Sequence, residues 1–291
     1  MTDAAATHRA ATASPGIATG GMPVILRYAI LLLVAGMVLV PLVATVLGGF
    51  KSLGYLRIDP FGLPREWEWR NYWDILSGGR YWRLMLNSMV IAVLTVALTV
   101  AVSAMAAFAF VHVRFFGATF LLNYLLLGLM FPAATAILPL FIKIRDLGLL
   151  DTYWGVVLPQ AAFGLAASVL LMRNYFRQLP DDLFDAAQID GCGYFGFFWY
   201  IVLPLSRPIL ATVAVITFVH SWNGYLLPLV VLNRETLYPW PLGIMAYQGE
   251  FSTDWHLVLA FITLTILPVI VMFFAAQRHI VAGLTAGSVK G

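Results

Sequence analysis

The sequence predicts an all-α, polytopic membrane protein with six transmembrane helices. Of its 291 residues, 61% are hydrophobic and only 11% are charged, and the mean hydropathy is +0.87. A helix needs about 20 apolar residues to cross the hydrocarbon of a bilayer, and only a helix satisfies the backbone of a single spanning segment. Six long stretches contain no Asp, Glu, Lys or Arg: residues 28–50, 84–113, 115–142, 152–172, 208–233 and 255–277.

The ends of the chain differ in composition from this membrane domain, which we place at residues 23–277. The first apolar stretch, residues 28–50, is longer than the apolar core of about 7–15 residues in a signal peptide, so we read it as a retained helix. Residues 1–22 are rich in Ala, Thr and Ser and are predicted to form a disordered tail. Counted over the whole chain, basic residues do not decide the orientation; without the 51–83 segment they favour cytoplasmic N- and C-termini, with residues 278–291 as a C-terminal tail.

Composition also excludes several kinds of site. Cys192 is the only cysteine, and the five histidines lack the spacing of metal ligands, so no metal site is expected. The net charge of +3 comes without a basic cluster, which argues against nucleic acid as a partner. No lysine completes the Gly-Lys-Ser/Thr of a phosphate-binding loop. We therefore expect no catalytic residues and no cofactor in this chain.

Prolines interrupt the predicted spans. The 115–142 stretch is too long for one straight span, and a break is expected near Pro132. Similar interruptions are expected at Pro159, Pro228 and Pro268. Broken helices often line transport routes, but prolines also produce simple packing kinks, and the sequence supports both readings.

The polar segment of about residues 173–207 contains a short predicted helix. Asp181 is placed to cap its N-terminus, and further acids in the first turn suit the positive end of the helix dipole. Gly191 marks its end. A helix of about nine residues is too short to be stable alone, so we expect it to dock into a cleft of a partner. The face predicted to dock comprises Leu183, Ala186, Ala187 and Asp190.

This segment resembles the cytoplasmic loop of permease subunits of binding-protein-dependent ABC importers. That loop reads Glu-Ala-Ala, three residues, Gly, nine residues, Ile, one residue, Leu-Pro. Here it stands as Asp185-Ala186-Ala187, Gly191, Ile201 and Leu203-Pro204, with Asp in place of Glu. The resemblance implies a type I ABC importer permease fold. It also implies contact with an ATPase through Asp181, Asp182, Leu183, Asp185, Ala186, Ala187, Asp190, Gly191, Leu203 and Pro204.

Two further segments, Trp222-Asn223 with its neighbours and the tail after Arg278, are similar to the second permease of maltose-type and glycerol-3-phosphate-type importers. This branch implies a sugar or sugar-like cargo and an inner-membrane location. The implied partners are a second permease, two ATPase subunits that bind ATP and Mg, an extracytoplasmic solute-binding protein and membrane lipid. An acid commonly follows Trp-Asn in this branch, whereas Gly224 stands here.

Three further assignments keep two readings each. Polar residues of the fifth stretch either line the translocation path or bond to a neighbouring helix: His220, Ser221, Trp222, Asn223 and Tyr225. The 233–254 loop either contacts the binding protein or is a plain connector; its candidates are Tyr238, Trp240 and Tyr247. The 278–291 tail either frays or, by resemblance, inserts between the ATPase subunits.

Two other functional classes remain as alternatives. An ion-coupled secondary transporter is the main one, although the six stretches lack the charged residue that usually couples an ion at mid-membrane. A membrane enzyme is the other, but the sequence has no Gly-x-Ser-x-Gly or His-Glu-x-x-His motif.

Overall fold

The computed structural model describes residues 24–285, including their side chains except at 275–276 and 278–285. The predicted disordered tail, residues 1–22, and the final residues 286–291 lie outside this range. The chain divides into two compact units at Ala44/Thr45. The main helices are α1 Val24–Gly49, α2 Leu53–Ile58, α3 Trp69–Ser77, α4 Gly79–His112, α5 Ala118–Leu127, α6 Ile137–Asp146, α7 Tyr153–Phe176, α8 Asp182–Ile189, α11 Arg207–Trp222 and α14 Trp255–Thr285.

Shorter elements connect these helices. They are η1 Gly128–Met130, η2 Ala133–Ala136, α9 Tyr194–Phe197, the π-helical turn η3 Phe198–Val202, α10 Leu203–Leu205, α12 Leu226–Val231, η4 Glu235–Leu237, α13 Trp240–Gly243 and η5 Ile244–Tyr247. The 51–83 segment, which lies between the first two apolar stretches, contains α2 and α3. Helix α14 also continues to Thr285, past the predicted boundary at residue 277.

Six spans are present if each of two bent helix pairs counts as one. Four helices are long and apolar enough to cross a membrane: α1, α4, α7 and α14. The first bent pair, residues 118–130 and 133–146, turns by 93°, and the second, residues 194–205 and 207–222, turns by 76°. The prediction of six spans is thus confirmed, and so is the break at Pro132.

The helices are not broken at the other prolines, and one predicted span boundary was wrong. Pro159 lies inside α7 and Pro268 inside α14, and both helices continue through them. The 208–233 stretch is not one helix, because α11 ends at Trp222 and a separate short helix, α12, carries Pro228. A helix in lipid retains its remaining backbone hydrogen bonds around a proline, whereas the polar Asn223-Gly224 pair ends α11.

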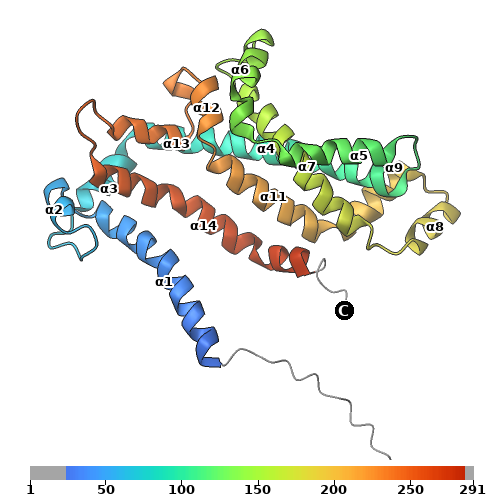
Figure 1. The fold of residues 1–291 in the computed structure, drawn as a ribbon, viewed down its shortest axis with the longest axis horizontal. Coiled ribbons are helices and arrows are strands. Elements are labelled where there is room, and N and C mark those ends of the chain that lie inside the picture. Colours follow the sequence, from blue (N-terminus) through green and yellow to red (C-terminus); the bar gives the residue numbers. More distant parts are fainter. Residues whose placement is uncertain (1–23, 286–291) are drawn as a thin grey trace, which may run out of the picture. The chain divides into compact units, whose positions relative to one another are not determined.

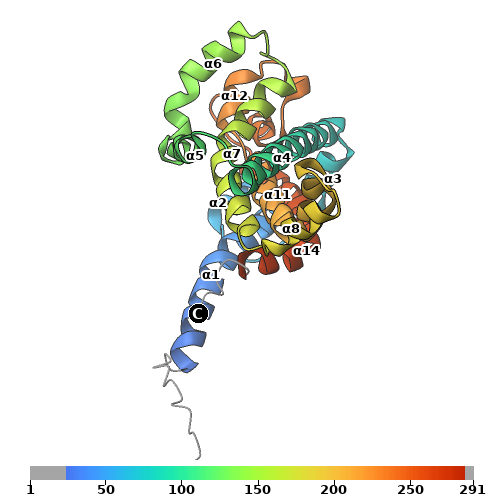
Figure 2. The same ribbon diagram turned by 90° about the vertical axis from the view of Figure 1, so that its right-hand side faces the viewer.

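The second unit is built around α4 and α7, which pack along their lengths, with α11 packed against α4, α7 and α14. Figure 1 shows α4, α7, α11 and α14 running alongside one another, with α8 and α9 at the end opposite α3. Figure 2 shows the bent pair α5 and α6 beside α7. Small residues permit the close approach of helices in membranes, and buried alanines recur in these helices: Ala92, Ala104, Ala107, Ala161 and Ala166.

The segment after α1 is fixed by a buried lysine. Lys51 is fully buried, and its Nζ donates a hydrogen bond to the carbonyl oxygen of Asp59 at 2.6 Å. Asn71 Nδ2 donates to the carbonyl oxygens of Gly49 and Lys51 at 2.9 and 3.0 Å. Phe50 packs its ring against Tyr72 and two tryptophans. This segment is therefore an ordered cap on the end of α1.

Gly49, which follows the unit boundary, packs against Ala260 of α14, and its substitution gives a direct test. A Cβ at Gly49 would lie 2.8 Å from the Cα and 2.9 Å from the backbone N of Ala260, atoms that cannot rotate away. We expect Gly49→Ala to lower the free energy of unfolding by about 1–3 kcal/mol through overpacking. Gly36→Ala, where a Cβ meets nothing within 4 Å, is the matched control. Thermal unfolding in detergent would measure both; equal midpoints would contradict this packing.

Candidate functional site

Helix α8 carries the predicted coupling residues and is held against the bundle by aromatic rings. The Phe184 ring lies 5.0 Å from Phe197 and 5.1 Å from Tyr194, centroid to centroid. His112, at the end of α4, lies 5.3 Å from Phe197 and 6.1 Å from Phe184. With Phe108 of α4, these side chains form one cluster, which we call the aromatic joint. The joint links α8 to the C-terminal end of α4.

The two ends of α8 are formed differently from one another. Asp181 has helical backbone angles and makes no capping hydrogen bond, so its predicted capping role was wrong. Gly191 has φ +79°, and the backbone N–H of Cys192 donates to Ala187 O at 2.8 Å. This is the left-handed turn that ends many helices, and it confirms Gly191 as the stop.

The predicted docking face of α8 is divided by the structure. Ala187 is buried within the subunit, and Leu183 packs against the same cluster as the aromatic joint. Ala186 and Asp190 are exposed instead. The face left for a partner, which we call the outer face of α8, comprises Asp182, Asp185, Ala186, Ile189 and Asp190. The short helix is therefore stabilised by its own subunit on one side and is open on the other.

The remaining coupling candidates follow in the α9–η3–α10 element. Leu203 packs at the edge of the aromatic joint, and Pro204 is exposed. Ser206, at the bend before α11, is fully buried. The element runs without a gap from α9 to this bend, whereas the turn at residues 190–193 separates it from α8.

The polar residues of the fifth stretch separate into two groups. Trp222 is buried, and its Nε1 donates to Thr265 O of α14 at 3.3 Å, which fits the reading that it bonds to a neighbouring helix. Ser221 is also buried. His220, Asn223 and Tyr225 lie on the surface of the subunit, although Asn223 Nδ2 donates to Val219 O of its own helix.

Gln160 of α7 is a polar residue that the sequence reasoning missed. Its Oε1 accepts a hydrogen bond from Ser221 Oγ at 2.6 Å and another from Thr95 Oγ1 of α4 at 3.3 Å. Three helices therefore meet at one amide. A signal was present, because Gln160 is the only amide side chain in the 152–172 stretch.

The 233–254 loop begins with a tightly bonded segment. Asn87 of α4 is buried and donates to Thr236 O and Tyr238 O, both at 2.9 Å, while accepting from Tyr153 Oη at 2.8 Å. Asp151, at φ +55°, accepts from the backbone N–H of residues 233 and 234 at 2.6 and 2.9 Å. The same two N–H groups hold the pKa of the Asp151 carboxyl below its usual value.

Because of this anchoring, the three residues predicted to contact the binding protein are less exposed than a surface contact requires. Tyr238, Trp240 and Tyr247 are all partly buried and pack against the core next to Trp222 and Phe261. The exposed part of the loop is the short hairpin paired at Gln248 and Thr253, with the Phe251 side chain 93% exposed. The hairpin tip therefore offers more surface to another protein than the three named residues do.

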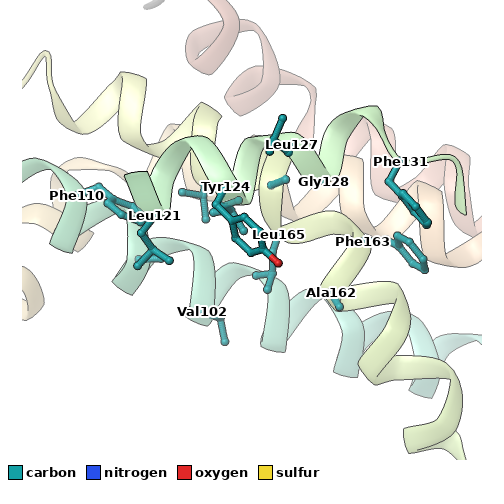
Figure 3. A pocket seen from close by; sticks show the side chains of 14 residues that line it. Val102, Phe110, Leu121, Tyr124, Leu127, Gly128, Phe131, Ala162, Phe163 and Leu165 are labelled. Atoms are coloured by element: carbon teal, nitrogen blue, oxygen red, sulfur yellow. The ribbon is translucent and has the colours of Figure 1, made fainter. Parts of the chain in front are cut away.

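One groove along α7 is lined by apolar side chains. It encloses about 710 Å³ between α4, α5 and α7. Figure 3 shows Tyr124, Leu121 and Leu127 along one wall, with Ala162 and Phe163 of α7 opposite. Its lining offers almost no hydrogen-bonding groups, so it suits lipid or an apolar helix and not a polar solute.

The described residues thus combine apolar spans with a short, half-exposed helix, α8, at one end of the bundle. These features define a multi-pass membrane permease. The chain belongs to the family described as the binding-protein-dependent transport system inner membrane component, whose model matches residues 98–286. It is therefore the membrane permease of a binding-protein-dependent ABC importer, and not an ion-coupled secondary transporter or an enzyme.

Known proteins agree with this membership. The diacetylchitobiose uptake system permease protein NgcG of Streptomyces coelicolor is 32% identical over 267 residues, covering 91% of this chain and 88% of that protein. The arabinooligosaccharides transport system permease protein AraQ of Halalkalibacterium halodurans is 37% identical over 215 residues, or 74% and 76% of the two chains. A bacterial ABC transporter involved in import of the polysaccharide alginate shares the fold, with a TM-score of 0.77, 24% identity and coverage of 87% and 95%.

Asn87 gives a test of the loop anchoring. We expect Asn87→Ala to lower the free energy of unfolding by about 2–4 kcal/mol, because two carbonyls and a tyrosine hydroxyl lose a buried partner. Limited proteolysis should then cut the 233–254 loop faster. Asn71→Ala is the matched control, because it also removes an amide that donates to two carbonyls but in the 51–83 segment. Unchanged cleavage of the 233–254 loop in Asn87→Ala would refute the anchoring role.

Proposed function

We propose that this permease forms half of the translocation pathway for a sugar or sugar-like solute, together with a second permease subunit. Two separate ATPase subunits bind ATP and Mg and drive the cycle, and an extracytoplasmic solute-binding protein delivers the solute. The N- and C-termini face the cytoplasm, which places α8 on the side of the ATPases.

The outer face of α8 is the observation that carries the coupling role. Ile189 is 86% exposed on a helix only eight residues long. An apolar side chain presented beside Asp182 and Asp185 suits a mixed docking contact, in which a central apolar group is covered and the acids lie at the rim. The aromatic joint behind it supplies the stiffness that a moving partner requires.

The cargo class is supported by the relatives and by the chemistry of the bundle. Diacetylchitobiose and arabinooligosaccharides, named for two relatives, are both carbohydrates. The branch resemblance around Trp222-Asn223 points the same way. The side chains exposed near the end of α11, His220, Asn223 and Tyr225, are uncharged hydrogen-bonding groups or a weakly basic ring, which suit hydroxyl-rich solutes.

Ile189 provides the principal test. We expect Ile189→Asp to weaken association with the ATPase subunits about thirtyfold, the effect of losing about 2 kcal/mol at a central contact residue. Ile58→Asp is the matched control, since Ile58 is 81% exposed on α2 at the other end of the bundle. Co-purification of the complex from membranes would compare the two. An equal yield of ATPase with both variants would refute docking through α8.

The acidic and inner residues of α8 should respond differently. We expect Asp185→Ala to leave ATPase assembly intact, because an exposed ion pair contributes only about 0–1 kcal/mol. Ala187→Trp should abolish assembly, not by filling the partner's cleft as the sequence suggested, but by forcing α8 off the aromatic joint. Protease sensitivity of α8 in the isolated subunit distinguishes these causes; a resistant α8 in Ala187→Trp would contradict the internal role.

A further inference from the structure

Placing the amide of Gln160 inside a membrane span costs free energy, so its position calls for an explanation. It lies about two turns into α7, inside a span, and polar groups there need partners because lipid supplies none. Its Oε1 accepts from both Ser221 Oγ and Thr95 Oγ1. In the structure, the carbonyl end of the amide therefore faces two hydroxyls on different helices.

The other end of the amide is left without a partner. Among the described residues, none accepts a hydrogen bond from Gln160 Nε2, and the side chain is only partly buried. Gly224, just after the end of α11, lies close to this donor: a Cβ at Gly224 would lie 2.8 Å from Nε2. Any residue other than glycine at 224 would therefore crowd this donor, and glycine leaves it open.

We propose that Gln160 is a solute-contacting residue of the translocation route. Its Nε2 donates a hydrogen bond to a hydroxyl or acetal oxygen of the passing solute, while Thr95 and Ser221 hold the amide in position. This inference rests on the proposed function for its solute class. It adds a residue on α7 to a route for which the sequence had suggested only residues of the fifth stretch.

Chemical labelling tests whether water reaches this position. The background is Cys192→Ala, which removes the only cysteine of the chain. Gln160→Cys is compared with Ala162→Cys, two residues along the same helix but in the apolar groove of Figure 3. The probe is a charged methanethiosulfonate reagent, applied to the assembled importer in proteoliposomes with and without ATP plus vanadate.

Because the cysteine thiolate attacks the reagent and displaces its sulfinate, and because the thiolate forms only where water is present, we expect Gln160→Cys to react at least about tenfold faster than Ala162→Cys in one of the two states. Equal rates, or no reaction of Gln160→Cys in either state, would overturn the placement of Gln160 on the route.

Transport tests the hydrogen bond itself. Uptake of radiolabelled diacetylchitobiose, arabinobiose and trehalose is measured with the complete importer, normalised to assembled complex. For a sugar that the unmodified importer transports, Gln160→Met should lower the maximal rate about fivefold, the effect of one lost hydrogen bond of about 1 kcal/mol. The KM should stay the same, because the binding protein sets it. Ser168→Ala, which removes another buried polar group of α7, is the control and should transport normally.

The outcomes separate the two proposals. A normal rate in Gln160→Met, or an equal loss in Ser168→Ala, would overturn the solute contact, as would failure of Gln160→Met to assemble, which would indicate a packing role. If the unmodified importer takes up none of the three sugars, the proposed cargo class fails, while the labelling rates still decide whether Gln160 faces an aqueous route.

Discussion

Hydrocarbon offers no hydrogen-bond partner, and this constraint determines how the polar atoms of the spans are arranged. Hydroxyls turn back to their own helices, as Thr263 Oγ1 does to Leu259 O and Thr212 Oγ1 to Pro208 O. Trp222 Nε1 instead donates to Thr265 O of a neighbouring helix, α14. Gln160 uses one end of its amide: its acceptor bonds to two hydroxyls, and its donor bonds to none of the described residues. Inside a span, a donor that has no hydrogen-bond partner is a stronger indication of function than the many donors that have one.

The long helices were predictable from the sequence because a segment that lies in hydrocarbon must be nearly free of charged residues. Five of the six stretches correspond to a helix or bent pair, and the break at Pro132 followed from a stretch too long for one span. The breaks expected at Pro159 and Pro268 are absent, because a proline removes only one backbone hydrogen bond. The other hydrogen bonds keep the helix intact in lipid. The end of α11 was missed because Asn223-Gly224 carries no charge.

In the segment around α8, local sequence patterns predict the helix but not which of its faces packs against the subunit. Spacing identified a short helix ending at Gly191, and the left-handed turn there agrees. The same spacing could not tell which side of the helix would face its own subunit. Phe184, which the docking face did not include, decides this by inserting among Phe197, Tyr194 and His112. Contacts between α4 and a helix some 70 residues later are not encoded in any periodicity.

The 76° bend at Ser206 gives the molecule a mechanical property. Helix α8 and the α9–η3–α10 element lie on one side of the bend, and α11 lies on the other. With 16 residues at about 1.5 Å rise each, α11 is a lever arm about 24 Å long, and a tilt of about 10° would move its far end by about 4 Å. Ser221 sits at that far end. A displacement of this size exceeds the reach of its hydrogen bond to Gln160, so a tilt of α11 about Ser206 would release the amide.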